Sequence, residues 1–339
     1  MACSTQTASR SDRERFDPPL LRHRWVTAES LGRAAFLAEA RARSAAAGFG
    51  PAAFDRLLWH GGLHLDGRPH CGDELPGRVE GGMRVDLYAF AREPEAIPLG
   101  SERILAEGSD WLAADKPAWL PTQATRASRR LSLEAALRSV TGCAALAAVH
   151  RLDRETSGVV LLAKTSEAAG RLGRALAAGR ARKRYLAVVS PAPDRECFQV
   201  SGFLGRVLDP RRYRFALRDA AQPGFRWSRT RFRCVAIDGV RAGVAAEPVT
   251  GRSHQIRVHL SASGTPIAGD VVYGGAAAAR LLLHAVGLEI QEEAIAIEAP
   301  LPADLGPAFA VREGPSEARS PLRDARAAGA PPSLDSCGR

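Results

Sequence analysis

A strongly apolar run follows a charged turn in the stretch "HRLDRETSGVVLLAKT", residues 150–165. The run "GVVLLA" has no polar residue on either face, which is typical of a strand covered on both sides by other elements. Such a strand requires a layered fold with a substantial core, and it fixes the preceding turn at the end of a sheet. In that turn, Asp153 stands between Arg151 and Arg154.

The neighbours of Asp153 predict that its carboxylate is ionised. Arginine keeps its proton at any working pH, so two adjacent guanidinium groups hold the pKa of an aspartate below its usual value of about 3.9. The carboxylate is then either a structural ion-pair partner of Arg151 or Arg154, or a catalytic nucleophile placed by a rigid strand end. These residues alone leave both interpretations open.

The chain as a whole is long and basic. Its 339 residues, 45% of them hydrophobic, suffice for roughly two domains. The formal net charge of +10 favours a polyanionic partner such as nucleic acid, although a GC-rich genome also enriches arginine. Because the six cysteines are scattered, we expect free thiols and no metal. We see no signal-peptide core and no run long enough to span a membrane, so we expect a cytoplasmic protein without a membrane partner.

Composition divides the chain into four parts. Residues 1–19 and 313–339 are polar and rich in proline or charge, so we expect flexible tails. Residues 20–95 predict a small α/β unit with a hairpin at the Asp66–Gly67 turn. Residues 96–312 mix strands and helices in irregular order, which favours an α+β domain on a mixed sheet over a doubly wound fold.

Two helices are expected near the basic motifs. One would begin at Ser166 as its N-cap and stop at Gly179. The other covers "HQIRVHLSA", with Ser253 as its cap and its end near Gly264.

A tyrosine follows a second basic run. Tyr185 lies on the predicted strand "KRYLAVV", directly after "RARKR". Its ring offers a flat face on which a base can stack, and its hydroxyl can take part in a hydrogen bond. The alternative is a core tyrosine whose tip reaches the surface.

The segment "TGRSHQIRVH" gathers cationic and imidazole side chains on one predicted helix. Ile256 and Leu260 would face the core, while His254 and Arg257 would share another face. His254 and His259 lie on different sides of such a helix, so we do not expect them to bind a metal. The planar guanidinium of Arg257 suits a carboxylate or a phosphate, and the alternative is a solvated basic face.

A third basic segment, residues 209–234, interleaves arginine with aromatic residues. The aromatic residues are Tyr213, Phe215, Phe225, Trp227 and Phe232. Phosphate contacts from arginine together with aromatic stacking are what single-stranded or looped RNA requires. Antiparallel strands with apolar residues inward and arginines outward give the same pattern.

Four motifs taken together resemble the RluA-type family of RNA pseudouridine synthases: "HRLDRETSGVVLLAKT", "KRYLAVV", "TGRSHQIRVHL" and "LLLHAVGLEI". The resemblance covers roughly residues 100–300. It implies a pseudouridine-synthase fold with a central mixed, largely antiparallel sheet, an RNA cleft across the sheet, no cofactor and no metal. It also implies isomerisation of uridine, in which the bond from ribose to the base nitrogen is exchanged for a bond to carbon 5 of the uracil. Residues 20–95 resemble, more weakly, the small S-four-type RNA-binding module of many relatives.

The resemblance implies roles position by position. Asp153 matches the catalytic aspartate, Tyr185 the base-stacking tyrosine and Arg257 the active-site arginine, which would keep Asp153 charged and oriented. The remaining positions expected at the RNA are Arg151, Arg154, Arg252, His254 and His284. Of these, Arg151 and Arg252 would hold the loop or the RNA backbone. For His284, in the "LHA" motif, a structural role at the floor of the cleft fits better than proton transfer.

One position departs from the family pattern. In "DKPAW", Trp119 stands where the family's early motif has a glycine, and its bulk would reshape the rim of the cleft.

The sequence therefore predicts an enzyme that isomerises uridines in ribosomal or transfer RNA, and the resemblance implies that it acts as a monomer. The alternative is a noncatalytic RNA-binding or ribosome-assembly protein that uses the same basic cleft. In such a protein, Asp153 would be dispensable.

Overall fold

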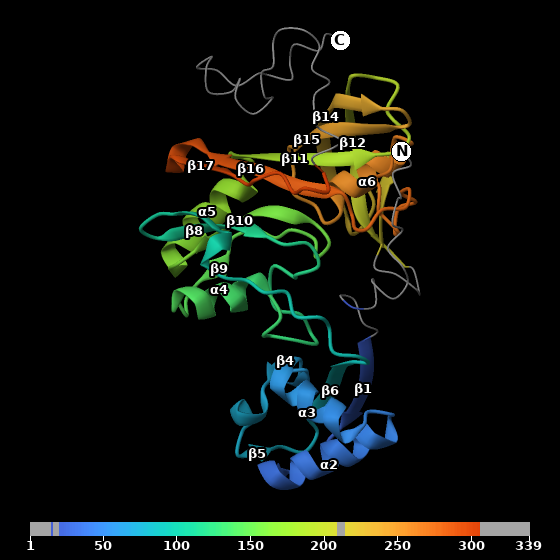
Figure 1. The fold of residues 1–339 in the computed structure, drawn as a ribbon. Helices are drawn as coiled ribbons and strands as arrows, with labels where there is room; N and C mark the ends of the chain where they lie inside the picture. Colours follow the sequence, from blue (N-terminus) through green and yellow to red (C-terminus); the bar gives the residue numbers. More distant parts are fainter. Residues whose placement is uncertain (1–14, 16–19, 209–213, 306–339) are drawn as a thin grey trace. The chain divides into compact units, whose positions relative to one another are not determined.

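The computed structural model describes residue 15, residues 20–208 and residues 214–305 (Figure 1). These fall into two compact units: an N-terminal unit that ends at Arg174 and a C-terminal unit that begins at Ala175. The tails expected over 1–19 and 313–339, apart from Arg15, lie outside the described residues, and so does Tyr213.

The first part of the N-terminal unit is a small α/β module. Its elements are β1 (Leu20–Val26), β2 (Leu31–Gly32), α2 (Arg33–Ala46), α3 (Pro51–His60), β3 (Leu63–Leu65), β4 (Arg68–His70), β5 (Arg78–Val79) and β6 (Arg84–Phe90). Four strands form a sheet in the order β1-β6-β3-β4, and α3 packs against β6 (Figure 1). The core of the module is built around the fully buried rings of Phe36 and Phe54. Asp66 and Gly67 have φ angles of 47° and 84° between β3 and β4, which confirms the predicted hairpin.

The second part of the N-terminal unit carries the apolar strand that the sequence predicts. Its elements are β7 (Ile104–Glu107), β8 (Trp111–Lys116), α4 (Leu133–Thr141), β9 (Ala147–Ala148) and β10 (Ser157–Ala163). The strand order is β10-β8-β7, and β9 also pairs with β10. Every residue of β10 is buried. The charged turn around Asp153 therefore leads directly into a buried strand, as predicted.

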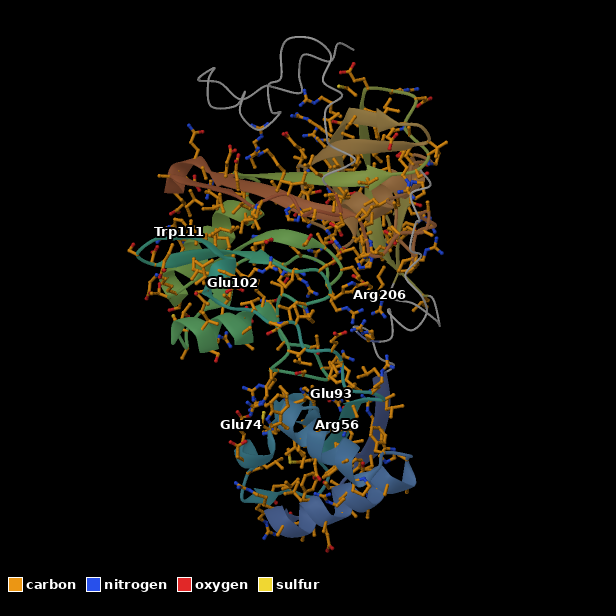
Figure 2. The ribbon with its side chains drawn as sticks, viewed as in Figure 1. Arg56, Glu74, Glu93, Glu102, Trp111 and Arg206 are labelled. Carbon is orange, nitrogen blue, oxygen red and sulfur yellow. The ribbon has the colours of Figure 1, made fainter. Side chains whose placement is uncertain are left out.

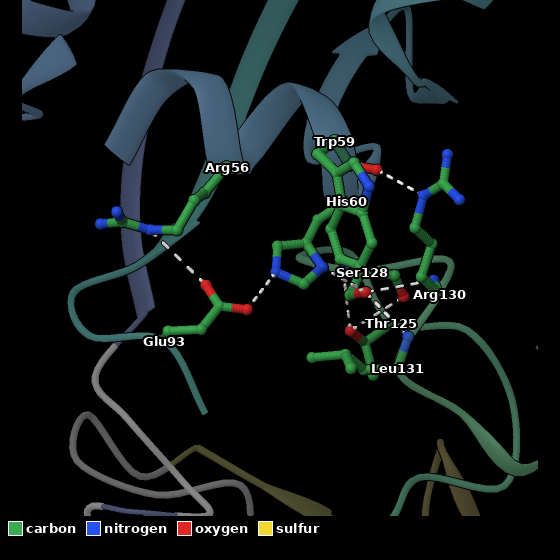
Figure 3. Close-up of polar contacts among 8 residues, drawn as sticks. All are labelled: Arg56, Trp59, His60, Glu93, Thr125, Ser128, Arg130 and Leu131. Carbon is green, nitrogen blue, oxygen red and sulfur yellow. Dashed lines mark hydrogen bonds and ion pairs between the residues drawn. The ribbon is translucent and has the colours of Figure 1, made fainter. Parts of the chain in front are cut away.

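Polar contacts tie the small module to residues 125–131, hereafter the 125–131 segment (Figure 3). His60 lies between Ser128 and Glu93, with its Nδ1 atom 3.0 Å from Ser128 Oγ and its Nε2 atom 2.7 Å from Glu93 Oε1. Glu93 also forms an ion pair with Arg56 at 3.6 Å (Figure 2 and Figure 3). Arg129 pairs with Glu74. The segment is thus fixed to the module by several side chains.

Helix α5 (Ser166–Ala177) follows β10 and contains the boundary between the two units. Its N-cap is Thr165, whose Oγ1 accepts a hydrogen bond from the Ala168 amide at 3.1 Å. The prediction of Ser166 as the cap is thus wrong by one residue, because the threonine hydroxyl one position earlier reaches the amide. Gly179, with φ of 73°, follows the helix as predicted.

The C-terminal unit is built on an antiparallel sheet. Its elements are β11 (Ala181–Val189), β12 (Cys197–Val207), β13 (Arg214–Arg218), β14 (Phe225–Asp238), β15 (Arg241–Pro248), α6 (Gln255–Ala262), β16 (Leu283–Ile290) and β17 (Ile295–Glu298). The strands follow the order β13-β12-β14-β15-β11-β16, with β17 paired to β16. Ile256 and Leu260 of α6 join the core against this sheet, as the helical spacing predicts. The α+β class is confirmed.

Three further details concern the sequence predictions. Helix α6 begins after His254, which has φ of 56° and makes no side-chain cap, so the prediction of Ser253 as the cap is wrong. Cys197 is disulfide-bonded, so the expectation of free thiols is wrong there, whereas Cys71, Cys143 and Cys234 are free. Within the described ranges, no helix is long and apolar enough to cross a membrane.

Candidate functional site

The Asp153 turn belongs to the N-terminal unit. Asp153 is half-buried, and its carbonyl oxygen accepts a hydrogen bond from the Thr156 amide at 3.1 Å, which closes the turn before β10. Arg151 is exposed. Arg154 lies 3.7 Å from the carboxylate of Glu155, and its guanidinium carbon lies 6.0 Å from the ring centre of Trp119.

The backbone on both sides of Asp153 is held by buried side chains. The Thr122 hydroxyl accepts from the Leu152 amide and donates to the Leu152 carbonyl oxygen, both at 3.1 Å. On the other side, Lys116 Nζ donates to the carbonyl oxygen of Arg154 at 3.1 Å. Lys116 is 0% exposed, and it also donates to the carbonyl oxygens of Pro117 and Leu120 at 3.0 and 2.7 Å. These three carbonyl oxygens can accept hydrogen bonds from all three N–H groups of the ammonium, so the positive charge of Lys116 is held next to the Asp153 turn.

Neither Lys116 nor Thr122 was among the predicted site residues. The sequence did contain a signal for Lys116, because "DKP" places a lysine at the end of a strand. A lysine is rarely buried there unless polar partners compensate its charge. What the sequence does not reveal is that this lysine bonds to the backbone of a turn that comes 38 residues later.

Tyr185 lies on β11 in the C-terminal unit. It stands opposite Ala246 of β15 and Ala285 of β16, so small side chains flank it on both neighbouring strands. The ring is half-buried and packs partly against the core of the unit. Both interpretations of this tyrosine therefore keep support, since part of the ring is in the core and part is accessible.

Arg257 lies on α6 and is buried. Its Nε and Nη2 atoms donate to the two carboxylate oxygens of Asp270 at 2.7 and 2.9 Å. The side chains of the pair are only 3% and 0% exposed. The alternative of a solvated basic face is thus wrong for Arg257, because the guanidinium fork is engaged by a carboxylate inside the fold.

Asp270 was missed by the sequence analysis, although its carboxylate accepts four hydrogen bonds. Besides Arg257, its Oδ1 atom accepts from the amides of Val272 and Tyr273 at 3.0 and 3.1 Å. The Arg257 guanidinium also lies 5.3 Å from the ring centre of Tyr273. Asp270 thus orients Arg257 through charge, and its own position is set by the backbone that follows it.

The residues around the start of α6 form a second network. His254 Nδ1 lies 2.8 Å from the Tyr273 hydroxyl, and its ring lies against that of Phe215 at 5.2 Å between centres. The Arg252 amide donates to Gln255 Oε1 at 3.0 Å, and its guanidinium donates to the Trp227 carbonyl oxygen at 3.2 Å. Arg252 and His254 are thus brought together with Arg257 at one end of α6.

His284 and His259 are both fully buried, on β16 and α6 respectively. Burial lowers the pKa of His259 to about 4. Burial first, and then the charge of Arg280, lowers the pKa of His284 to about 4. Both imidazoles are therefore neutral at pH 7. For His284, neutrality favours the structural role over proton transfer.

Lys183 is a further cation that the predictions did not include. It lies two residues before Tyr185 on β11 and donates from Nζ to the Thr250 carbonyl oxygen at 3.2 Å. Burial, and then the nearby charge of Arg252, lowers the pKa of this lysine. The start of α6 is thus a region of concentrated positive charge.

The candidate site residues are divided between the two units. Asp153, Arg151 and Arg154 belong to the N-terminal unit, and the other predicted residues belong to the C-terminal unit. Across the described parts of the chain, no group of three or more His, Cys, Asp or Glu side chains has the geometry to hold a metal ion.

Comparisons with known proteins show which family this chain is similar to. The sequence profile of the family described as RNA pseudouridylate synthase matches residues 110–262. An uncharacterised RNA pseudouridine synthase of Zymomonas mobilis subsp. mobilis is 35% identical over 225 residues, which are 62% of this chain and 100% of that protein. Ribosomal large subunit pseudouridine synthase D of Xanthomonas campestris pv. campestris is 32% identical over 236 residues, 62% of this chain and 69% of that protein. The solved structure of Human RNA Pseudouridylate Synthase Domain Containing 1 has a TM-score of 0.52 and 26% identity, covering 63% of this chain and 89% of that one.

Fold and relatives together define an enzyme that isomerises uridine in RNA. The chain belongs to the RluA-type family of RNA pseudouridine synthases. It spans about half the length of several other curated relatives that it matches. Family membership favours the enzyme over the noncatalytic RNA-binding protein.

Proposed function

We propose that this protein isomerises specific uridines of ribosomal or transfer RNA with Asp153 as the catalytic carboxylate. The observation that carries the proposal is that buried groups hold the backbone on both sides of Asp153, directly before a fully buried strand. A reacting group that must meet a flipped-out base needs such a fixed position. Relatives named for the large ribosomal subunit and for tRNA support the class of RNA.

Other residues take their proposed roles from the family motifs. Tyr185 supplies a ring face for the flipped uracil, which offsets an unstacking cost of a few kcal/mol. Arg257, oriented by Asp270, is the active-site guanidinium. Arg151 and Arg252 hold the loop or the RNA backbone.

The reaction has a simple balance. The bond between ribose and the base nitrogen breaks, and a bond between ribose and carbon 5 of the uracil forms. The hydrogen of carbon 5 leaves as a proton, and the freed ring nitrogen takes up a proton. Asp153 either attacks the ribose or the base as a nucleophile, or it assists removal of a ribose proton. Because the product is an isomer of the substrate, no redox cofactor is needed.

The test uses release of tritium from RNA labelled at carbon 5 of its uridines. Purified protein is incubated with labelled ribosomal RNA and, separately, with labelled transfer RNA, in the presence of a metal chelator. We expect release from at least one of the two pools by the wild type and none by Asp153→Asn. Absence of release from both pools would contradict the proposed substrates.

We further propose that the protein acts as a monomer, as the family resemblance implies, and in the cytoplasm, as its sequence leads us to expect. Light scattering in solution should give the mass of a single 339-residue chain. A dimer mass at micromolar concentration would refute the monomer. Recovery of the protein outside the cytoplasmic fraction of the source cells would refute the location.

A further inference from the structure

A cavity of about 280 Å³ lies in the N-terminal unit beside the Asp153 turn. Its apolar lining includes Leu20, Phe90, Ile97, Trp119, Leu120 and Leu131. The volume is close to the lower end of the range of small-molecule sites, about 300–1,000 Å³. The cavity therefore suits a single flat group such as one nucleobase better than a larger ligand.

Trp119 forms part of this lining from a strained backbone position. Its φ angle is 70°, in the left-handed region that costs energy for any residue except glycine. The family pattern noted above has a glycine here, which avoids the cost. A large aromatic residue held in such a conformation at a cavity wall points to a use for its ring.

The cavity has a cationic rim formed by Arg126, Arg130 and Arg154. Within the described parts of the chain, neither Arg126 nor Arg130 has a carboxylate partner; instead, their guanidinium groups lie over the rings of Tyr88 and Trp59 at 5.8 and 4.8 Å. The carboxylate in the lining, Glu95, is ion-paired to Arg15 at 2.6 Å. The positive charges of Arg126 and Arg130 are therefore left for an anion, and a phosphate matches the guanidinium geometry.

Hydrogen bonds within the protein hold the cavity wall that carries Arg126 and Arg130, so this wall is ordered without a ligand. Ser128 Oγ accepts from the amides of Arg130 and Leu131 at 3.1 and 3.0 Å, and it contacts His60 (Figure 3). The contacts from Ser128 to His60 and from His60 to Glu93 resemble those of the catalytic triad of a serine hydrolase. However, Ser128 is fully buried and its oxygen is occupied by two amides, so the contact is structural. Arg130 is held further by its bond to the Trp59 carbonyl oxygen at 2.7 Å.

The cavity is joined to the Asp153 turn through Lys116. The ammonium of Lys116 bonds to the carbonyl oxygens of Leu120, in the lining, and Arg154, at the rim. Arg154 is the residue after Asp153. A group bound in the cavity would thus contact a residue that is adjacent in sequence to the proposed catalytic carboxylate.

We propose that this cavity receives one nucleotide of the substrate RNA that neighbours the target uridine. Its base stacks on Trp119, and its phosphate contacts Arg126 and Arg130. The inference rests on the proposed function, because it takes RNA as the substrate. It adds a specificity site at a residue where this chain departs from the family pattern.

The test compares Trp119→Gly with Trp119→Phe. Glycine removes the ring and also the backbone strain, so the fold should be kept, while phenylalanine retains an aromatic face. Affinity is measured by filter binding of labelled ribosomal RNA and transfer RNA, each variant in the Asp153→Asn background so that no turnover occurs. Stacking of one base on an aromatic ring is equivalent to about 5- to 150-fold in affinity. We expect a loss in that range for Trp119→Gly and a loss below about threefold for Trp119→Phe.

The rim is tested with Arg126→Ala and a matched variant, Arg174→Ala. Arg174 is exposed on α5 and does not line the cavity, so each variant removes one positive charge from the same unit. Removing one phosphate contact to single-stranded RNA should lower the slope of log affinity against log salt by about 0.7. We expect that change for Arg126→Ala and not for Arg174→Ala.

The outcomes separate the two claims. Wild-type affinity for both RNA pools in Trp119→Gly would overturn the cavity assignment, and so would equal salt slopes for the two arginine variants. Failure of the wild type to release tritium would instead overturn the proposed function, because the binding measurements do not depend on catalysis.

Discussion

Replacing Asp270 by asparagine should strongly destabilise the C-terminal unit. The carboxylate accepts four hydrogen bonds, two from Arg257 and two from backbone amides, and both side chains of the ion pair are almost fully buried. Breaking a buried ion pair by removing one charge typically costs about 3–5 kcal/mol. Since asparagine keeps the shape and one acceptor oxygen, we expect a loss near the lower end, about 3 kcal/mol.

The structure offers a matched control at Asp304. Arg280 binds Asp304 with the same two-bond geometry, at 2.5 and 2.8 Å, but the Asp304 side chain is 41% exposed. Because solvent screens such a pair, Asp304→Asn should cost no more than about 1 kcal/mol. Urea unfolding followed by circular dichroism measures both variants against the wild type.

Activity provides a second readout for Asp270→Asn. If Asp270 orients Arg257 for the reaction, Asp270→Asn should lower kcat for tritium release under conditions where the variant is still folded, and Asp304→Asn should not. Equal stability losses in the two variants would refute the argument from burial. Wild-type kcat in folded Asp270→Asn would refute the orienting role.

Three further predictions follow from the described contacts. Lys116→Met should cost about 2–4 kcal/mol and reduce kcat, because three buried or partly buried carbonyl oxygens lose their donor. The control is Lys164→Met, at a lysine whose side chain is 21% exposed, which should cost less than about 1 kcal/mol by urea unfolding. The pKa of buried His284 is about 4, below its unfolded value of about 6.5, so the native state resists protonation and loses stability as pH falls from 6.5 towards 4. The free energy of unfolding, measured at pH 7 and pH 5, should fall by about 2 kcal/mol less in His284→Gln than in the wild type. An unchanged pH dependence would contradict the lowered pKa of His284. RNA affinity should fall steeply between low and moderate salt, since arginine–phosphate contacts release counterions, and a flat dependence would argue against a basic RNA surface.

Much of the local structure was predictable because single segments determine it. The run "GVVLLA" has no polar side chain to expose, and it forms the fully buried β10. The Asp66–Gly67 turn needs two positive φ angles, which this residue pair adopts readily, and it forms the hairpin. In both cases the decisive physics lies within a few residues.

The sequence analysis missed features that depend on contacts between distant segments. Lys116 bonds to the turn at Arg154, and Arg257 pairs with Asp270, which lies on a loop with no periodic pattern. The start of α6 was misplaced for a local reason, because His254 adopts a left-handed conformation where a serine cap was expected. For the candidate site, motif spacing identified the charged residues but not the buried groups that hold them.

The central claim is that Asp153 is the catalytic carboxylate, and the rate of tritium release by Asp153→Asn tests it most directly. Asp238→Asn is the matched control, because Asp238 is an exposed aspartate at the end of β14. Both variants should bind RNA and unfold like the wild type. We predict that Asp153→Asn loses at least about 100-fold in rate, as expected for loss of a reacting carboxylate, while Asp238→Asn keeps the wild-type rate. Tritium release by Asp153→Asn at the wild-type rate would contradict the account.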